Sequence, residues 1–352
     1  MSDLGTRMTD ERVRALDKRM DGIYSTAYDT AIRRERQALN RMALFNVSLP
    51  VDITDEQRRT QALLQANSKA AREMSDRIAS YLSEGGAKAV TEIRRTTQEA
   101  YSINLDYGRF SIDRQAGVFL PYETIDARQL RIQLGLEGDP PFSKIRSIEE
   151  YKGWTPVRDK DGVWMVKDGK KVRRSIYARD RAFAGLADDR MIVRRLQNEL
   201  TQSMLLGESR TQLTARFRKV AGMSHRQAMM VAQTEITRIQ SQTRHLSILE
   251  AQALGVEMEK TWMARMVRTR DTHADLNGIT VPAGDPWITI DGNELMFPGD
   301  PDAHAEEVIN CHCVERPRVK DVPLSVIHAR EMAGMTVDKR IGFAEWRERR
   351  GN

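Results

Sequence analysis

Both cysteines of this 352-residue chain and three of its six histidines lie in one stretch near the C-terminal end. Cys311 and Cys313 flank His312, while His273 and His304 precede them. Thiolate sulfur and imidazole nitrogen are zinc ligands, and a structural zinc site uses about four of them. One reading is therefore a zinc site made by His273, His304, Cys311 and Cys313, although C-x2-C is more typical of such sites than C-x-C. The plainer reading is that the thiols are small buried groups.

Two catalytic readings use the same stretch. A cysteine nucleophile would need His273 as its base, but no local nucleophile signature accompanies it. A metal-dependent nuclease would take its cation ligands from Asp271, His273, Asp275, Asp300 and His304. Asp275 and Asp300 are more simply explained as turn and cap residues. We therefore expect an architectural role for this stretch, with an enzyme as the alternative hypothesis. We expect no cofactor other than a zinc ion.

The architectural reading rests on turn chemistry. Asn277-Gly278 and Pro298-Gly299-Asp300-Pro301 are turn formers between short segments. In an extended strand Cys311 and Cys313 would share one face, with His312 on the other. We expect a polar network that ties these strands together, formed by Arg268, Arg270, His273, Asn277, Gly278, Pro298, Gly299, Asp300 and Asn310.

Amphipathic helices must position this stretch. The apolar spacing predicts helices over 9–45, from about 54 to a stop at Gly85-Gly86, over 188–206 and over 224–253. Capping boxes are expected at Thr54, Ser209 and Ser224, and a β-hairpin over 157–166. The fold class is α+β, with a mainly helical N-terminal and central body and a small C-terminal module of short strands. Its regions are 1–110, a loop-rich segment 111–187, 188–319 and an amphipathic tail 320–352.

Charge is unevenly distributed along the chain. The net charge is +6, but residues 256–319 carry −6 and residues 1–255 carry +10. A basic body indicates contact with nucleic acid or an acidic partner. The arginines expected to contact DNA are Arg33, Arg34, Arg36 and Arg41. No apolar run approaches the roughly 18–20 residues of a membrane helix, and no signal peptide is visible, so we expect assembly in the cytoplasm.

Several motifs taken together resemble one family. They are Ala232-x-Thr234-Glu235, Trp262, Arg268-x-Arg270-x-x-His273, Leu276-Asn277-Gly278, Phe297-Pro298-Gly299-Asp300-Pro301 and Asn310-Cys311-x-Cys313. Their order and spacing over residues 190–318 resemble the phage Mu protein F-like family of phage minor head proteins. Val267 stands where many members have an acidic residue, and His312 where Arg is frequent.

The resemblance implies a head-morphogenesis protein that associates with the portal vertex and is retained in the particle. Its expected partners are the portal protein, the major capsid or scaffolding protein, and DNA bound without sequence preference, but no membrane. It would reside in the virion, in the capsid interior or at the portal vertex. The resemblance implies no established enzyme activity.

Overall fold

The computed structural model describes residues 3–43, 54–122, 155–159, 162–167, 170–173, 179–265, 269–300 and 303–351. Long helices and short antiparallel strands make up these ranges, which confirms the α+β class. The chain forms two compact units. Unit 1 comprises Met1–Val13, Arg95–Ala178 and Gln233–Asn352, and unit 2 comprises Arg14–Arg94 and Arg179–Ala232. These units divide the chain differently from the four consecutive regions, whose boundaries remain a sequence prediction. Among the described helices, none has both the length and the apolar character of a membrane span.

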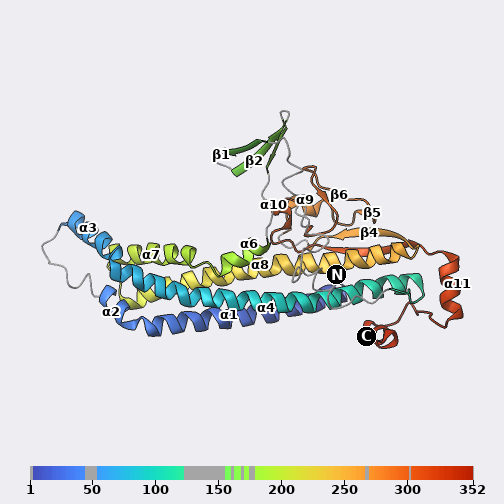
Figure 1. The fold of residues 1–352 in the computed structure, drawn as a ribbon, viewed down its shortest axis with the longest axis horizontal. Helices are drawn as coiled ribbons and strands as arrows, with labels where there is room; N and C mark the ends of the chain where they lie inside the picture. Colours follow the sequence, from blue (N-terminus) through green and yellow to red (C-terminus); the bar gives the residue numbers. More distant parts are fainter. Residues whose placement is uncertain are drawn as a thin grey trace. The chain divides into compact units, whose positions relative to one another are not determined.

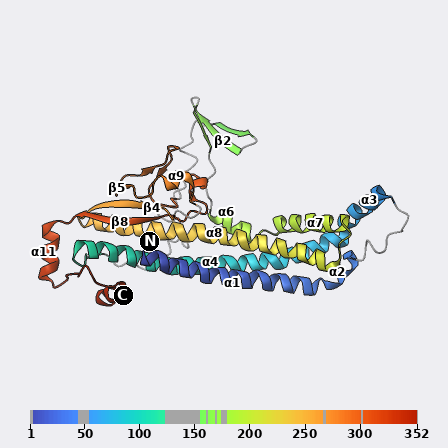
Figure 2. The same ribbon diagram turned by 180° about the vertical axis from the view of Figure 1, so that it is seen from behind.

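Unit 2 is helical. Figures 1 and 2 show parts of three long helices running side by side within it, with shorter helices beside them. The long helices are α1 (Leu4–Arg34), α4 (Lys69–Ala116) and α8 (Arg210–Ala253), and the shorter ones are α2 (Arg36–Ala43), α3 (Asp55–Ala66), α6 (Arg179–Leu186) and α7 (Asp189–Leu205). Their apolar stripes meet in one core that includes Leu39, Met74, Ile78, Leu196 and Phe217. Burial of such stripes is what stabilises long amphipathic helices in water.

The helix starts of unit 2 follow local sequence rules. Thr54 and Gln57 form the reciprocal capping box that the sequence predicts. The backbone amide of Ser209 donates to Gln212 Oε1 at 2.9 Å, and the amide of Gln212 donates to Ser209 Oγ at 3.4 Å. The carboxylate of Asp188 accepts from the amide of Arg190 and so caps α7. Two expected caps and the 188–206 helix are therefore confirmed.

Two expected interruptions are wrong. The helix α4 continues through Gly85-Gly86 instead of ending there. Gly86 is needed because the backbone of Leu186 lies against it: a Cβ at this position would be 1.8 Å from the carbonyl oxygen of Leu186. Ser224 is no N-cap but lies inside α8, where its hydroxyl donates to the carbonyl oxygen of Val220 at 3.3 Å. The expected helix over 9–45 begins earlier, at Leu4, and changes from α1 to α2 at Glu35.

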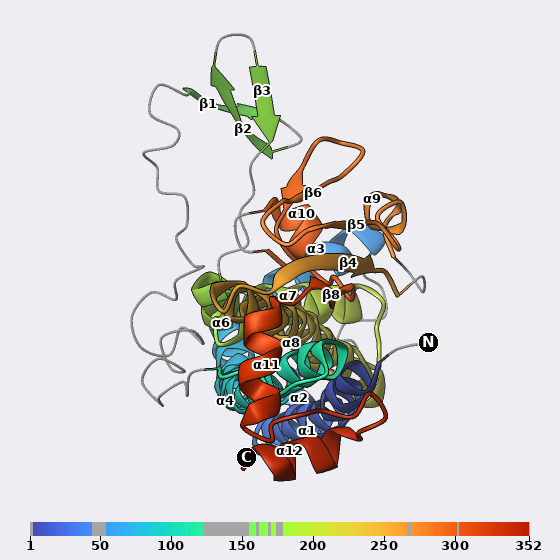
Figure 3. The same cartoon turned by 90° about the vertical axis from the view of Figure 1, so that its right-hand side faces the viewer.

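Unit 1 contains the strands. The expected hairpin is confirmed and gains a third strand, giving the antiparallel order β1 (Thr155–Asp159), β2 (Gly162–Lys167) and β3 (Lys170–Arg173). A second antiparallel sheet has the order β5 (Thr280–Pro282), β4 (Glu257–Met263) and β8 (Val314–Asp321). The strands β6 (Trp287–Ile288) and β7 (Glu294–Leu295) pair separately. Figure 3 shows β4 and β8 beside α8, and the short helices α9 (Asp271–Ala274) and α10 (Ala305–Val308) belong to the same module.

The tail beyond β8 packs within unit 1. It forms α11 (Leu324–Met332) and α12 (Phe343–Arg350), and α12 buries Phe343 and Trp346 against Phe110. Trp346 Nε1 donates to Asp113 Oδ2 at 3.0 Å, and Arg350 Nη1 lies 2.7 Å from the same oxygen. Burial nevertheless raises the pKa of Asp113 to about 6. The tail therefore closes over a buried carboxylate.

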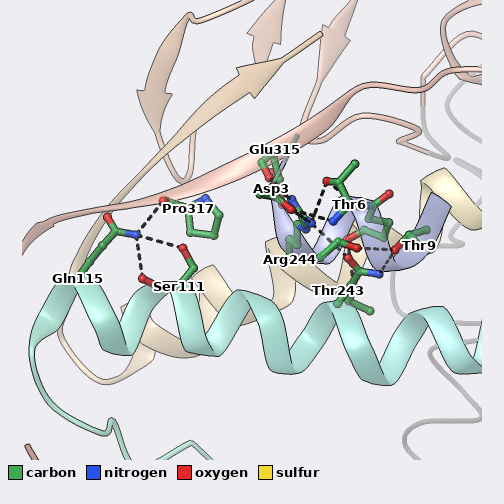
Figure 4. Close-up of polar contacts among 12 residues, drawn as sticks. Asp3, Thr6, Thr9, Ser111, Gln115, Thr243, Arg244, Glu315 and Pro317 are labelled. Atoms are coloured by element: carbon green, nitrogen blue, oxygen red, sulfur yellow. Dashed lines mark hydrogen bonds and ion pairs between the residues drawn. The ribbon is translucent and has the colours of Figure 1, made fainter. Parts of the chain in front are cut away.

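A buried arginine joins three separated segments of unit 1. Arg244, on α8, is 1% exposed and binds the carboxylate of Asp3 near the start of the chain. It also donates to Asn104 Oδ1 on α4 at 3.3 Å and to the carbonyl oxygen of Glu315 on β8 at 3.2 Å. Figure 4 shows Asp3, Thr6 and Glu315 around this guanidinium. The polar face of α8 is thus used to position β8, which follows the cysteine pair.

Candidate metal centre

The strand β4 packs against the residues of the cysteine–histidine stretch. Its side chains alternate in burial, which places Met258, Lys260 and Trp262 on the covered face. Trp262 packs edge-on against His273 and Trp287, with ring centroids 5.1 and 5.2 Å apart. Leu276, Leu295 and both cysteines complete this small core. The imidazole and the thiols are therefore held in an apolar, water-poor environment.

The two thiols converge on one nitrogen of His273. That histidine lies in α9, is 1% exposed, and has its Nδ1 atom 3.5 Å from Cys311 Sγ and 3.6 Å from Cys313 Sγ. All three potential ligand atoms lie within 4.8 Å of one another. Cys311 and Cys313 are 3% and 2% exposed and are not joined in a disulfide. The structure therefore places His273 and the cysteine pair side by side.

The cysteine pair lies between a turn at residues 309–310 and the strand β8, which begins at Val314. Asn310 has the left-handed backbone conformation, with φ 56°, which asparagine tolerates better than most residues. Its amide donates to Thr234 Oγ1 on α8 at 2.9 Å. After this turn the amide of Cys313 donates to Cys311 Sγ at 3.4 Å. Beyond the turn, both sulfurs lie beside His273 Nδ1.

The other nitrogen of His273 faces Glu307, a residue the sequence reading missed. Nε2 lies 2.9 Å from Glu307 Oε2, and the carboxylate is 3% exposed. Thr272 Oγ1 donates to the same oxygen at 3.1 Å, and Asn293 Nδ2 donates to Oε1 at 3.0 Å. Nothing in the sequence separates Glu307 from the neighbouring Glu306, because only the fold of the loop before α10 decides which carboxylate turns inward.

The electrostatics of this cluster favour charge on particular atoms. Burial opposes a charged imidazole, but the contacts with Cys311 and Glu307 outweigh it and raise the pKa of His273 above its usual value. Burial opposes a charged Glu307 as well, yet His273 lowers the pKa of that carboxyl. The hydrogen bond between the thiols lowers the pKa of Cys313 and raises that of Cys311. The cluster thus joins a carboxylate, an imidazole and two thiols by direct contacts.

The remaining motif residues act locally rather than as one network. Arg268 and Pro301 lie outside the described residues. Arg270 Nη2 donates to the carbonyl oxygen of Ile309 at 2.8 Å, and its other nitrogen donates to that of Glu306. The exposed Asn277 accepts from the amide of Ala264 at 2.9 Å through Oδ1.

The second turn motif packs against α8. The Asp300 carboxylate accepts from the amide of Met296 at 2.9 Å, and Pro298 is buried. Gly299 has φ +80°, and a Cβ there would lie 3.1 Å from Arg238 Cα, so this position requires glycine for both conformation and space. Gly278 also has positive φ, and its amide donates to the carbonyl oxygen of Trp262 at 2.8 Å. These residues shape loops and do not converge on a ligand.

The structure separates His304 from the other expected metal ligands. Its imidazole is half-buried, and Nδ1 lies 3.9 Å from Glu306 Oε1. Within the described residues, His273, Cys311 and Cys313 are the group that gathers potential metal ligands, and it excludes His304. Asp271 and Asp275 are exposed, so the carboxylates of the nuclease reading are not gathered either.

The arginines expected to contact DNA lie in unit 2 and are all exposed. Arg33 and Arg36 line a hollow of about 430 Å³ together with Arg210 and Arg218, two arginines that the sequence reading did not single out. Asp29 is the acidic residue of that lining, 3.5 Å from Arg218. Arg34 and Arg41 are not part of the lining.

The chain is similar to known proteins over part of its length. The family model described as "Phage Mu protein F like protein" matches residues 194–316. The arginine ADP-ribosyltransferase EFV of Enterococcus faecalis is 30% identical over 123 residues, which are 35% of this chain and 25% of that protein. Minor head protein GP7 of Bacillus phage SPP1 is 29% identical over 161 residues, 45% of this chain and 52% of GP7.

A third relative is the uncharacterized protein YqbB of Bacillus subtilis, 28% identical over 126 residues, 35% of this chain and 41% of YqbB. The chain thus spans between a quarter and about half of the length of these curated relatives. No solved structure matches it significantly.

Proposed function

We propose that the protein has a role in building the phage head, because residues 194–316 match the model of the phage Mu protein F-like family and the chain is similar to a phage minor head protein. The protein associates with the portal vertex during assembly and is retained in the virion, in the capsid interior or at the vertex itself. The observation that carries the proposal is the similarity to Minor head protein GP7 over 161 residues, 45% of this chain.

An enzymatic role is the weaker candidate. A thiol, an imidazole and a carboxylate are aligned at Cys313, His273 and Glu307, as a hydrolase would need. Cys313 is only 2% exposed, so a substrate has no access to its sulfur in this conformation. The ADP-ribosyltransferase relative is matched over a quarter of its own length, so its named activity gives no support here.

DNA contact is a second part of the proposal. The hollow lined by Arg33, Arg36, Arg210 and Arg218 concentrates positive charge and contains one carboxylate, that of Asp29. Such a surface suits the phosphate backbone, and contacts with phosphate carry no information on base sequence. A head protein beside packaged DNA would use it for non-specific, salt-dependent binding.

Portal association is tested by co-expressing the protein with the portal protein of the same phage. We expect the two proteins to co-elute in size-exclusion chromatography. Mass spectrometry of purified particles should detect the protein at low copy number. Its absence from both portal complexes and particles would refute the assembly role.

A further inference from the structure

We propose that His273, Cys311 and Cys313 bind a zinc ion and that Glu307 positions the imidazole for it. The site lies entirely within unit 1 and draws its residues from α9, the loop before β8 and α10. The proposal concerns the chemistry of this cluster and is independent of the portal and DNA roles. It replaces the four-ligand set that includes His304 with a three-residue set.

The distances from the imidazole nitrogen to the two sulfurs fit one tetrahedral ion. Zinc–sulfur bonds of about 2.3 Å and zinc–nitrogen bonds of about 2.0–2.1 Å at a tetrahedral angle place sulfur and nitrogen about 3.6 Å apart. The observed distances from His273 Nδ1 are 3.5 Å to Cys311 Sγ and 3.6 Å to Cys313 Sγ. Two thiolates and one imidazole are a donor set that prefers zinc to magnesium or calcium. One tetrahedral position remains for a water molecule.

Glu307 supplies the second interaction that a zinc-binding histidine needs. Ligating histidines usually direct their other ring nitrogen at a carboxylate or carbonyl, which fixes the tautomer and the ring plane. Here Nε2 lies 2.9 Å from Glu307 Oε2, so Nδ1 is left for the metal. The carboxylate is itself held by Thr272 and Asn293. An imidazole fixed in this way is poised to act as a ligand.

The surrounding groups balance the charges that the ion would bring. A zinc ion displaces the protons of both thiols, so its two positive charges are offset by two thiolates. The remaining negative charge on Glu307 faces Arg270, whose Nη1 lies 3.8 Å from Oε2. The amide of Cys313 donates to Cys311 Sγ, an interaction that favours the thiolate. Buried charge is thus paired throughout the cluster, as burial requires.

The test is the metal content of the full-length protein purified without added metal. We expect about one zinc per chain by elemental mass spectrometry, and a lower melting temperature after chelation that zinc restores and magnesium does not. Cobalt(II) should replace zinc and give thiolate charge-transfer absorption together with tetrahedral d–d bands. This spectrum needs no variant and so does not depend on how well any substitution folds.

Variants assign the ligands. Cys311→Ser, Cys313→Ser and His273→Gln should each abolish stoichiometric zinc binding, whereas His304→Gln should retain it. Loss of zinc in His304→Gln equal to that in His273→Gln would overturn the three-residue assignment. A wild-type protein that takes up neither zinc nor cobalt, or that carries iron or copper at the site in place of zinc, would overturn the proposal itself.

Discussion

Arg244 holds Asp3 in a two-pronged ion pair, with Nη1 2.8 Å from Oδ2 and Nη2 2.9 Å from Oδ1, although 241 residues separate them in the chain. The Arg244 guanidinium lowers the pKa of Asp3 despite the burial that opposes it. Because the same guanidinium also reaches α4 and β8, one side chain fixes three segments of unit 1. The pair is bidentate and charge-assisted, which is the stronger class of such contacts.

Replacing Arg244 with alanine should lower the free energy of unfolding by about 3–5 kcal/mol, since it leaves Asp3 and the carbonyl oxygen of Glu315 without their donor. Chemical denaturation monitored by circular dichroism measures this loss. The control is Arg226→Ala at an exposed position of the same helix, expected to change stability by less than about 0.5 kcal/mol. Equal effects of the two substitutions would contradict the structural role of Arg244.

The free energy of unfolding should depend on pH through the titration of Asp113. Its pKa is raised to about 6 in the fold from 3.8, so between these values the folded state holds a proton that the unfolded chain releases. The free energy of unfolding should therefore fall as pH rises through this window, by up to about 3 kcal/mol. Asp113→Asn should remove that component. Urea titrations of both proteins from pH 4 to pH 7 measure the difference, and parallel pH profiles would contradict the prediction.

Two glycines in long helices should respond oppositely to alanine. A Cβ on Gly86 would lie 1.8 Å from the carbonyl oxygen of Leu186, so Gly86→Ala should destabilise by at least about 1–3 kcal/mol. Nothing lies within 4 Å of a Cβ on Gly22 in α1, so Gly22→Ala should stabilise by about 1 kcal/mol through helix propensity. Thermal melting compares the two variants. Stabilisation by both would mean that α4 does not approach Leu186.

Removing the charge of Glu307 should weaken zinc binding without abolishing it. Glu307→Gln is expected to lower zinc affinity by about 10–100-fold, the usual effect of losing a carboxylate behind a ligating histidine. Competition with a chromophoric chelator gives the affinity, and the cobalt spectrum should keep its tetrahedral form. Glu306→Gln, which changes the exposed neighbouring carboxylate, is the matched control. A zinc affinity in Glu307→Gln equal to that of the unchanged protein would show that Glu307 does not position His273.

Double-stranded DNA binding should weaken when the four arginines of the unit 2 hollow become glutamine. The variant combines Arg33, Arg36, Arg210 and Arg218, and the control carries the same charge loss at the exposed Arg59, Arg72, Arg194 and Arg226. Because each phosphate contact contributes about −0.9 to the slope of log affinity against log salt, the slope should become shallower by up to about 3–4 in the first variant. Fluorescence anisotropy at several salt concentrations measures it. Equal losses in both variants would mean that net charge, not the hollow, is responsible.

Local features of the fold were predictable from sequence, and features set by distant contacts were not. The caps at Thr54 and Ser209 depend on residues three positions apart, so their pattern is visible in the chain. Gly86 looks like a helix stop because the sequence does not show that Leu186 lies against it. Ser224 likewise matches a capping pattern, but its hydroxyl returns to Val220 inside a continuing helix.

The residues of the cysteine–histidine cluster show the same contrast between what the sequence reveals and what distant contacts decide. Cys311, Cys313 and His273 stand out as rare, chemically capable residues, so sequence alone could nominate them. Glu307 is one of 50 acidic residues, and only tertiary structure turns it toward the imidazole. His304 was nominated on residue type alone, and the loop before α10 directs it away from the thiols.

The ion pair between Asp3 and Arg244 also affects the order in which the two units fold during translation. Unit 1 requires the first 13 residues of the chain together with residues beyond 232, whereas unit 2 has all of its segments once residue 232 has emerged. At a synthesis rate of about 5–20 residues per second, Arg244 is added to the chain roughly 10–50 s after Asp3. During that interval the first 13 residues of the chain lack their final contacts, whereas the rest of the first helix belongs to unit 2. Unit 2 should therefore form first during translation, and unit 1 should close only near the end of synthesis.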